Sequence, residues 1–371
     1  MIDAFTSHQW ADVRDLEPYL EKGWGSVLMR NSHHPIRTGD LYINPRTRHA
    51  LREHEGATVD GMDYDAFATQ VLDATGAERV VLGYEAALSA TAFANPFLSM
   101  AVARGVNDWS ADRWLNRDDR LYGLAMIPTG DPAAAAEEIR RVAANPKFVG
   151  LALGANVLGV PYGNLVYDPI WAAAAETGLP IVFHAKADNA ITLAVPPVAG
   201  GLVATYGEYD AFSYQTVAAH LVSLIAQGIF DQHPSLRALI VGTGAAWLPG
   251  QLWRLDWAAR YAAMDAPWMT RNPSELFGAH VRVTTYGMEP AEGLIKVLQA
   301  LGWADDAIVY ASGWPHVTSA QAAAEVADRF PEAWRSRILA DTALDLYRFP
   351  DRPAMAAEPA RVSRTSMASL A

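Results

Sequence analysis

The stretch DPIWAAAAETGLPIVFH, residues Asp168–His184, contains the pattern that decides the fold. Its first part is typical of a helix. Gly178 follows as the residue that most readily ends a helix, because glycine adopts the left-handed conformation at little cost. The apolar run after it, Pro180–His184, is typical of a strand covered on both faces. The stretch therefore predicts one helix–strand unit of a parallel α/β sheet.

The same alternation recurs along the chain. Near-continuous apolar runs such as RVVLGY, RALIVG and AIVYA indicate buried parallel strands. Between them lie helical segments such as AAAAEEIRRVAA, which Asp131 caps and Pro132 opens. Eight strand–helix units predict a closed (β/α)8 barrel, the TIM-barrel class of α/β fold. The predicted strands are Ile2–Phe5, Arg79–Tyr84, Leu121–Ile127, Phe148–Gly154, Pro180–His184, Arg237–Gly242, His280–Thr285 and Ala307–Ala311.

Three segments depart from the alternation. Residues 29–60 are rich in polar residues and turn formers, which predicts a long loop insertion after the first strand. Residues 185–207 are rich in Gly, Pro and Ala and follow a strand end directly, where long loops are often functional. Residues 351–371 have little apolar periodicity and predict a flexible tail. We therefore expect one barrel domain over residues 1–350.

The amino-acid composition limits which metal ligands and binding partners are expected. The 371 residues include no cysteine, which excludes disulfides and thiolate metal ligands. The net charge of −12 argues against nucleic acid or an anionic membrane as partner. The N-terminus has no basic stretch followed by an apolar run, so we expect no signal peptide and a cytoplasmic location.

In a TIM barrel the active site lies at the carboxyl ends of the strands. His184 ends the fifth predicted strand, and an imidazole there could act as a general acid or base. Lys186 follows it and could act as a base or Schiff-base nucleophile in an apolar pocket. Glu289 could exchange a proton if it is desolvated. The side chains expected to bind substrate at the other strand ends are Phe5, Ser7, His8, Tyr286, Trp314 and His316.

Several longer runs carry a resemblance. NDWSADRWLNRDDRLYGLAMIPTGDPAAAAEEIRRVA, YGNLVYDPIWAAAAETGLPIVFH, HLVSLIAQGIFDQHPSLR and AWLPGQLWRLDWAARY together resemble the amidohydrolase-related family over roughly residues 3–349. That family includes metal-dependent decarboxylases related to aminocarboxymuconate-semialdehyde decarboxylase. The resemblance implies a TIM barrel, a small-molecule substrate and a homodimer. It also implies acid–base work near His220, which lies on a predicted helix.

The chain departs from the family at its metal ligands. Aligned on that resemblance, Phe5 and Ser7 stand where relatives carry the two ligands of strand one. The strand-five ligand is retained as His184. Gly242 stands where relatives of this subtype carry a Glu, and Gly313 replaces the ligand Asp after strand eight. A catalytic zinc site needs about three protein ligands. We therefore expect no metal cofactor, with a zinc site rebuilt from His8, His184 and His220 as the alternative.

These observations leave three hypotheses. The first is a metal-independent enzyme that uses acid–base catalysis for decarboxylation, dehydration, isomerisation or cyclisation, in specialised biosynthesis. The second is a metal-dependent decarboxylase or hydrolase with a rebuilt site. The third is a pseudoenzyme that binds without catalysis. The apolar and aromatic residues near the strand ends favour a hydrophobic, aromatic or polyketide-like substrate.

Overall fold

The computed structural model describes residues 1–8, 10, 12–30, 64–184, 203–262, 266–314 and 323–350. The predicted insertion at 29–60 lies outside these residues, except for Met29 and Arg30, which end helix α1. The predicted tail at 351–371 and most of the loop at 185–207 also lie outside them. The extent of the domain, the insertion and the tail therefore stay predictions.

All eight predicted strands are present, and they form one sheet in chain order with every neighbouring pair parallel. Most are buried along their whole length, as near-continuous apolar runs predict. The strands are β1 Ile2–Ser7, β2 Arg79–Gly83, β3 Leu121–Ile127, β4 Phe148–Leu153, β5 Ile181–His184, β6 Ala238–Val241, β7 Val281–Thr284 and β8 Ile308–Val309.

Hydrogen bonds bring the two ends of the sheet together. The backbone N–H of Ala4 in β1 donates to the carbonyl of Tyr310, just after β8, at 2.9 Å. Further along, the N–H of Ser7 donates to the carbonyl of Trp314 at 2.9 Å, and that of Gly313 donates to the carbonyl of Phe5 at 3.1 Å. The predicted (β/α)8 barrel is confirmed.

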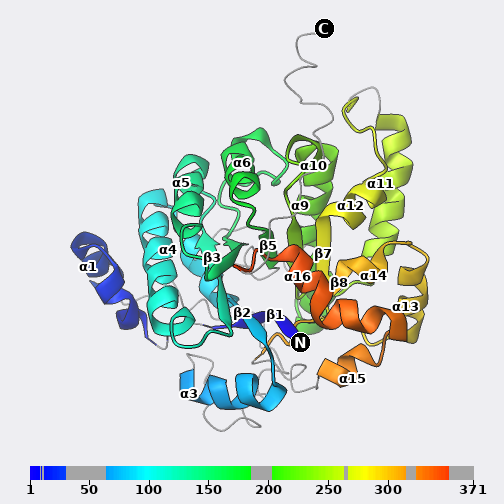
Figure 1. Cartoon of the computed structure of the whole chain (residues 1–371). Coiled ribbons are helices and arrows are strands. Elements are labelled where there is room, and N and C mark those ends of the chain that lie inside the picture. The colour runs from blue at the N-terminus through cyan, green and yellow to red at the C-terminus, as the bar shows by residue number, and fades with distance from the viewer. Residues whose placement is uncertain are drawn as a thin grey trace.

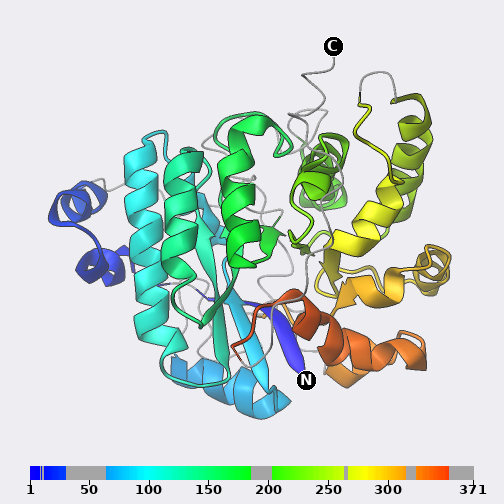
Figure 2. The same ribbon diagram turned by 45° about the horizontal axis from the view of Figure 1, so that its top comes forward.

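Helices surround the strands, and α4, α5 and α6 lie side by side along one flank in both views (Figures 1 and 2). The α-helices are α1 Lys22–Arg30, α3 Tyr64–Phe67, α4 Pro96–Ser110, α5 Pro132–Val142, α6 Asp168–Thr177, α8 Tyr206–Phe212, α9 Tyr214–Ala226, α10 Ile229–Gln232, α11 Leu248–Ala262, α12 Pro273–His280, α13 Glu292–Gln299, α14 Ala304–Ala307, α15 Ala323–Ala327 and α16 Thr342–Leu346. Short 3₁₀ or π segments are η1 Val13–Tyr19, η2 Ala68–Asp73, η3 Ala86–Thr91, η4 Ala111–Leu115, η5 Leu165–Tyr167, η8 Glu332–Trp334 and η9 Arg337–Asp341.

Local sequence signals set the helix ends. The side chain of Asp131 accepts a hydrogen bond from the N–H of Ala134, and Pro132 opens α5, so that predicted cap is confirmed. Gly178 ends α6 in the left-handed conformation, with φ at 69°, which confirms the predicted C-cap. In the described part of the chain, no helix has the length and apolarity needed to cross a membrane.

Candidate active site

Three predicted site residues meet at the carboxyl ends of the strands. Phe5 of β1 places its ring 5.5 Å from that of His184, at the end of β5. The same Phe5 ring stacks on Tyr286, which follows β7, with 6.4 Å between centroids and 6° between planes. His184 is only 5% exposed. Strands distant in sequence therefore deliver one imidazole and two aromatic rings to a single cluster.

A fourth member of this cluster, Glu85, was not singled out from the sequence. It lies two residues past the end of β2 and is 5% exposed. Its Oε1 accepts a hydrogen bond from the hydroxyl of Tyr286 at 3.0 Å and lies 3.7 Å from Nε2 of His184. The signal was available, because Glu85 directly follows the predicted strand Arg79–Tyr84.

Glycines make room for the two aromatic rings. A Cβ atom at Gly83 would lie 2.8 Å from Cδ2 of Phe5, and one at Gly313 would lie 2.6 Å from Cε2 of Tyr286. Gly313 also has φ at +62°, which side chains rarely tolerate. The Tyr286 ring therefore fills the space that a side chain at position 313 would need.

Electrostatics keep Tyr286 protonated. Burial and then the charge of Glu85 raise the pKa of the Tyr286 hydroxyl well above its ordinary value. Tyr206 and Asp210 on helix α8 raise the same pKa further by their charge. A phenol that stays neutral can donate steadily to the Glu85 carboxylate.

The structure gives His8 a setting unlike that of a substrate-binding residue. Its Nδ1 donates to the carbonyl of Gly83 at 2.8 Å, and its Nε2 accepts from the hydroxyl of Ser110 at 2.8 Å. The ring stacks on Trp109 of α4 and is 1% exposed. Burial lowers the His8 pKa to about 4. His8 therefore faces the helix layer as a neutral core histidine.

His220 lies on α9, as predicted, and is also buried. Its Nδ1 accepts from the backbone N–H of Tyr162 at 3.3 Å, and the two rings lie 4.1 Å apart. These contacts tie α9 to the segment after β4. These contacts give His220 a packing role, and its catalytic role stays a prediction.

Glu289 is the predicted acid or base after β7. Its Oε2 accepts hydrogen bonds from the backbone N–H groups of Ala245 and Ala246, at 2.9 and 3.2 Å. Those amides precede helix α11, so the carboxylate links the segments after β6 and β7. These two hydrogen bonds favour a structural role for Glu289 over the predicted role as an acid or base.

The remaining predictions divide into two groups. Trp314 packs edge-on against Phe67 of α3, with centroids 5.7 Å apart, and is thus directed towards a covering helix. Ser7 is buried on β1, and its N–H bonds to the carbonyl of Trp314. Lys186 and His316 lie outside the described residues, so their roles stay predictions.

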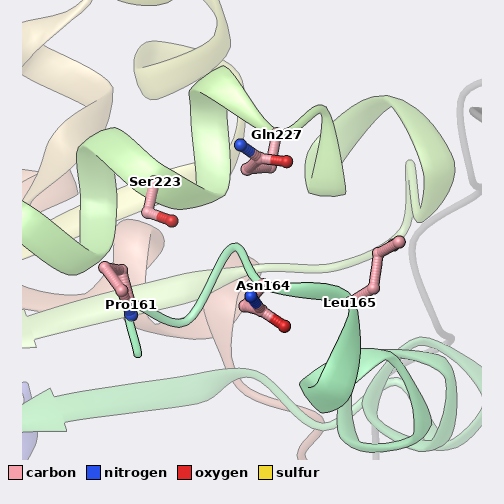
Figure 3. A pocket seen from close by; sticks show the side chains of 5 residues that line it. All are labelled: Pro161, Asn164, Leu165, Ser223 and Gln227. Carbon is pink, nitrogen blue, oxygen red and sulfur yellow. The ribbon is translucent and has the colours of Figure 1, made fainter. Parts of the chain in front are cut away.

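A cavity of about 320 Å³ lies away from this cluster (Figure 3). Ser223 and Gln227 line it from α9 and its end, and Asn164 lines it from the segment that joins β4 to α6. Asn164 accepts from the N–H of Val166, and Ser223 accepts from that of Gly163. These polar groups are used within the fold, and the cavity contains none of the predicted site residues.

Comparison with known proteins agrees with the barrel fold. Residues 81–349 match the amidohydrolase family, and the chain belongs to it. The chain is 32% identical to the gamma-resorcylate decarboxylase of Rhodococcus jostii (strain RHA1) over 58% of this chain and 66% of that protein. The resemblance seen in the sequence is confirmed.

Two solved structures extend the likeness of fold. The dihydroxybenzoic acid decarboxylase of Polaromonas sp. JS666, solved with manganese and 2-nitroresorcinol, has a TM-score of 0.66 and 21% identity, covering 93% of this chain and 97% of that one. The 5-carboxyvanillate decarboxylase of Novosphingobium aromaticivorans, solved with manganese, has a TM-score of 0.64 and 22% identity, covering 91% and 92%. These relatives are decarboxylases, whereas cyclase chemistry and a biosynthetic role find no support among them.

The solved relatives correct the expectation of no cofactor and of metal independence. They contain manganese, which indicates a metal cofactor in this family. The resemblance implies that most of the family's metal ligands are replaced in this chain, and that replacement stays a prediction. Phe5 and Gly313 offer no donor, and within the described ranges no group of three or more His, Cys, Asp or Glu could hold a metal. Glu85 and His184 are the described carboxylate and imidazole that meet at the strand ends.

Proposed function

We propose that this protein is a lyase that removes CO2 from a hydroxylated aromatic acid. The observation that carries the proposal is the cluster of Phe5, Glu85, His184 and Tyr286 at the strand ends. This is where barrel enzymes hold their reacting groups. Family membership and the decarboxylases among its relatives support the reaction class.

The reaction asks for two things from the site. The bond between the ring carbon and the carboxylate breaks, its electron pair stays on the ring carbon, and CO2 leaves. A proton must then take the vacated position on that carbon. The site must therefore hold a planar ring and place a proton donor near the carbon that loses CO2.

The described side chains suit these tasks. The stacked rings of Phe5 and Tyr286 form an aromatic wall, against which a substrate ring gains dispersion and hydrophobic contact. His184 carries the ionisable imidazole of the cluster and is the proton carrier in this proposal. Glu85, 3.7 Å from its Nε2, favours the protonated imidazole by its negative charge.

Purified full-length protein tests the proposal. It is incubated with 2,6-dihydroxybenzoate and with 5-carboxyvanillate, with and without added manganese, and CO2 and the aromatic product are measured. We expect CO2 release, and in D2O we expect one deuterium on the carbon that carried the carboxylate. His184→Ala should lower kcat by roughly 10²–10⁴-fold, the usual contribution of a positioned acid or base.

A second histidine variant serves as the matched control. His233 pairs with Asp168 at 2.9 Å between α10 and α6, outside the cluster, so His233→Ala should leave kcat within about twofold of wild type. Absence of CO2 release from both acids under every metal condition would reject the proposed reaction. Undiminished turnover in His184→Ala would remove His184 from it.

A further inference from the structure

A second cavity, of about 270 Å³, lies where the segments that follow β2, β3 and β4 meet. Pro128, which directly follows β3, is among the residues that line it. The cavity therefore lies on the face of the barrel where the carboxyl ends of the strands are found. It is lined by none of the four clustered residues of the candidate active site, which are Phe5, Glu85, His184 and Tyr286.

The walls of this cavity are mostly apolar. They comprise an aromatic ring, prolines, a methionine and branched aliphatic side chains, which are Phe93, Pro96, Met100, Pro128, Val157 and Leu158. Leu158 is 38% exposed, so part of this apolar surface faces solvent. The volume lies just below the roughly 300–1,000 Å³ of typical ligand pockets, which suits a molecule with a single ring.

Packing and hydrogen bonds fix the shape of the cavity. A Cβ atom at Gly130 would lie 2.9 Å from Cγ2 of Val157, so a side chain there would enter the space beside that wall. The hydroxyl of Thr91 accepts from the N–H of Ala155 at 2.8 Å, and the carbonyl of Thr91 accepts from the hydroxyl of Ser99 at 2.9 Å. These bonds join the segments after β2 and β4 to helix α4, so the cavity is formed before a ligand arrives.

The charges around the cavity nearly cancel. Asp131 is the ionisable side chain among the described lining residues, and its Oδ1 accepts from the N–H of Ala134 at 3.1 Å. Pro96 begins α4 and Asp131 caps α5, so two helices that stand side by side have their N-termini at the cavity (Figure 2). Each N-terminus carries about half a positive charge, and the two together offset one carboxylate. An uncharged ligand is therefore favoured over an anion or a cation.

Asp131 also defines one polar contact for such a ligand. A carboxylate is an acceptor only and offers about four lone-pair positions. The cap of α5 is the hydrogen bond described for this side chain, and it uses Oδ1. A ligand that reaches Asp131 must therefore present a donor, such as a hydroxyl group.

We propose that this cavity is a second ligand site, which binds an uncharged single-ring molecule through its apolar walls and through a hydroxyl group that donates to Asp131. A phenol meets these conditions. A phenol is also what remains when a hydroxylated aromatic acid loses CO2. The site would then bind the class of the product and not that of the substrate, a point that rests on the proposed function.

Met100 provides a readout inside this cavity. Full-length protein is labelled at its methionine methyl groups for NMR, and Met100→Leu identifies the Met100 signal. The signal is followed during titration with phenol, benzoate and benzylamine. We expect phenol to shift it with saturation by about 10 mM. Benzoate and benzylamine should bind there at least about tenfold more weakly, because each brings an uncompensated charge into an apolar cavity.

Three variants examine the walls and the carboxylate. Ala94→Trp fills the exposed edge of the cavity and should weaken phenol binding at least about tenfold. Ala144→Trp makes the same change at an exposed position just past the end of α5 and should stay within about twofold of wild type. Asp131→Asn keeps the helix cap and removes the charge, so the preference for phenol over benzoate should fall about threefold. A dispersed methyl spectrum establishes that each variant is folded.

The outcomes separate this inference from the proposed function. The inference would be overturned, even if CO2 is released, by a Met100 signal that does not shift up to about 10 mM phenol. Equal binding of benzoate or benzylamine, or unchanged phenol binding in Ala94→Trp, would overturn it as well. A Met100 response to phenol in a protein that releases no CO2 would support the second site and reject the reaction.

Discussion

The ring of Tyr286 occupies the space beside Gly313 that a side chain at that position would need. A Cβ atom on Gly313 would lie 2.6 Å from Cε2 of the ring. The resemblance to the family places a ligand aspartate at this position in relatives. The aromatic residue after β7 and the glycine after β8 are therefore sterically coupled.

This relationship predicts strong coupling between the two positions. Gly313→Ala should cost roughly 2–5 kcal/mol of unfolding free energy, since left-handed strain and overlap with the ring add together. In a Tyr286→Ala background only the strain of about 1–2 kcal/mol should remain. Urea unfolding of the wild type, the two single variants and the double variant measures the coupling.

Gly76 supplies the matched control for backbone strain. It has the same φ of +62°, and no atom lies within 4 Å of where its Cβ would be. Gly76→Ala should cost only about 1–2 kcal/mol. Equal losses for Gly76→Ala and Gly313→Ala, or additive effects of the Gly313 and Tyr286 changes, would contradict the steric relationship.

The raised pKa of Asp3 predicts that the contribution of this residue to the stability of the fold decreases as the pH rises. Burial raises its pKa from 3.8 to about 6, although the N–H groups of Ser312 and Phe5 donate to it. The folded state then binds the proton more tightly than the unfolded chain. The stabilisation is complete below about 3.8 and is lost as pH rises through about 6. This amounts to about 3 kcal/mol.

Asp3→Asn isolates that contribution. Asparagine keeps an acceptor oxygen for both N–H groups and does not titrate. The unfolding free energy of the variant minus that of wild type should increase by about 2 kcal/mol between pH 4 and pH 7.5. Urea unfolding at several pH values measures this difference, and a constant difference would show that Asp3 does not titrate as proposed.

The lowered pKa of His8 predicts the opposite dependence of stability on pH. Burial lowers its pKa from 6.5 to about 4, so the folded state holds the imidazole neutral. Its stabilisation is present above about 6.5 and is lost as pH falls through about 4. The advantage of wild type over His8→Gln should therefore shrink by up to about 3 kcal/mol on acidification. An advantage that stays level from pH 7.5 to 4 would be inconsistent with this setting.

The fold was predictable because it depends on patterns repeated along the chain. Strands that are apolar along their whole length, such as Phe148–Leu153, need to be buried on both faces of the sheet. Eight such strands predict a parallel barrel with helices around it. Helix caps such as Asp131 and Gly178 depend only on residues a few positions away. The ends of these helices can therefore be predicted from the local sequence.

The site was predictable only in part, since side-chain direction depends on local detail. Alternation along β1 directs Phe5 to the cluster, whereas His8, three residues later, faces α4. That parity was readable from the sequence. The direction of Glu289 towards the amides of Ala245 and Ala246 was not, because it depends on how two loops meet. The contacts that make Glu85 part of the cluster come from His184 at the end of β5 and Tyr286 just after β7.

Comparing the stability and the turnover of Glu289 variants distinguishes a structural role for this residue from a catalytic one. Glu289→Ala leaves the N–H groups of Ala245 and Ala246 without this acceptor, which should cost about 1–3 kcal/mol. Glu289→Gln keeps one oxygen and should lose less. Thermal unfolding and CO2 release are measured on both. A Glu289→Gln variant with wild-type stability and no turnover would instead support the catalytic role predicted from sequence.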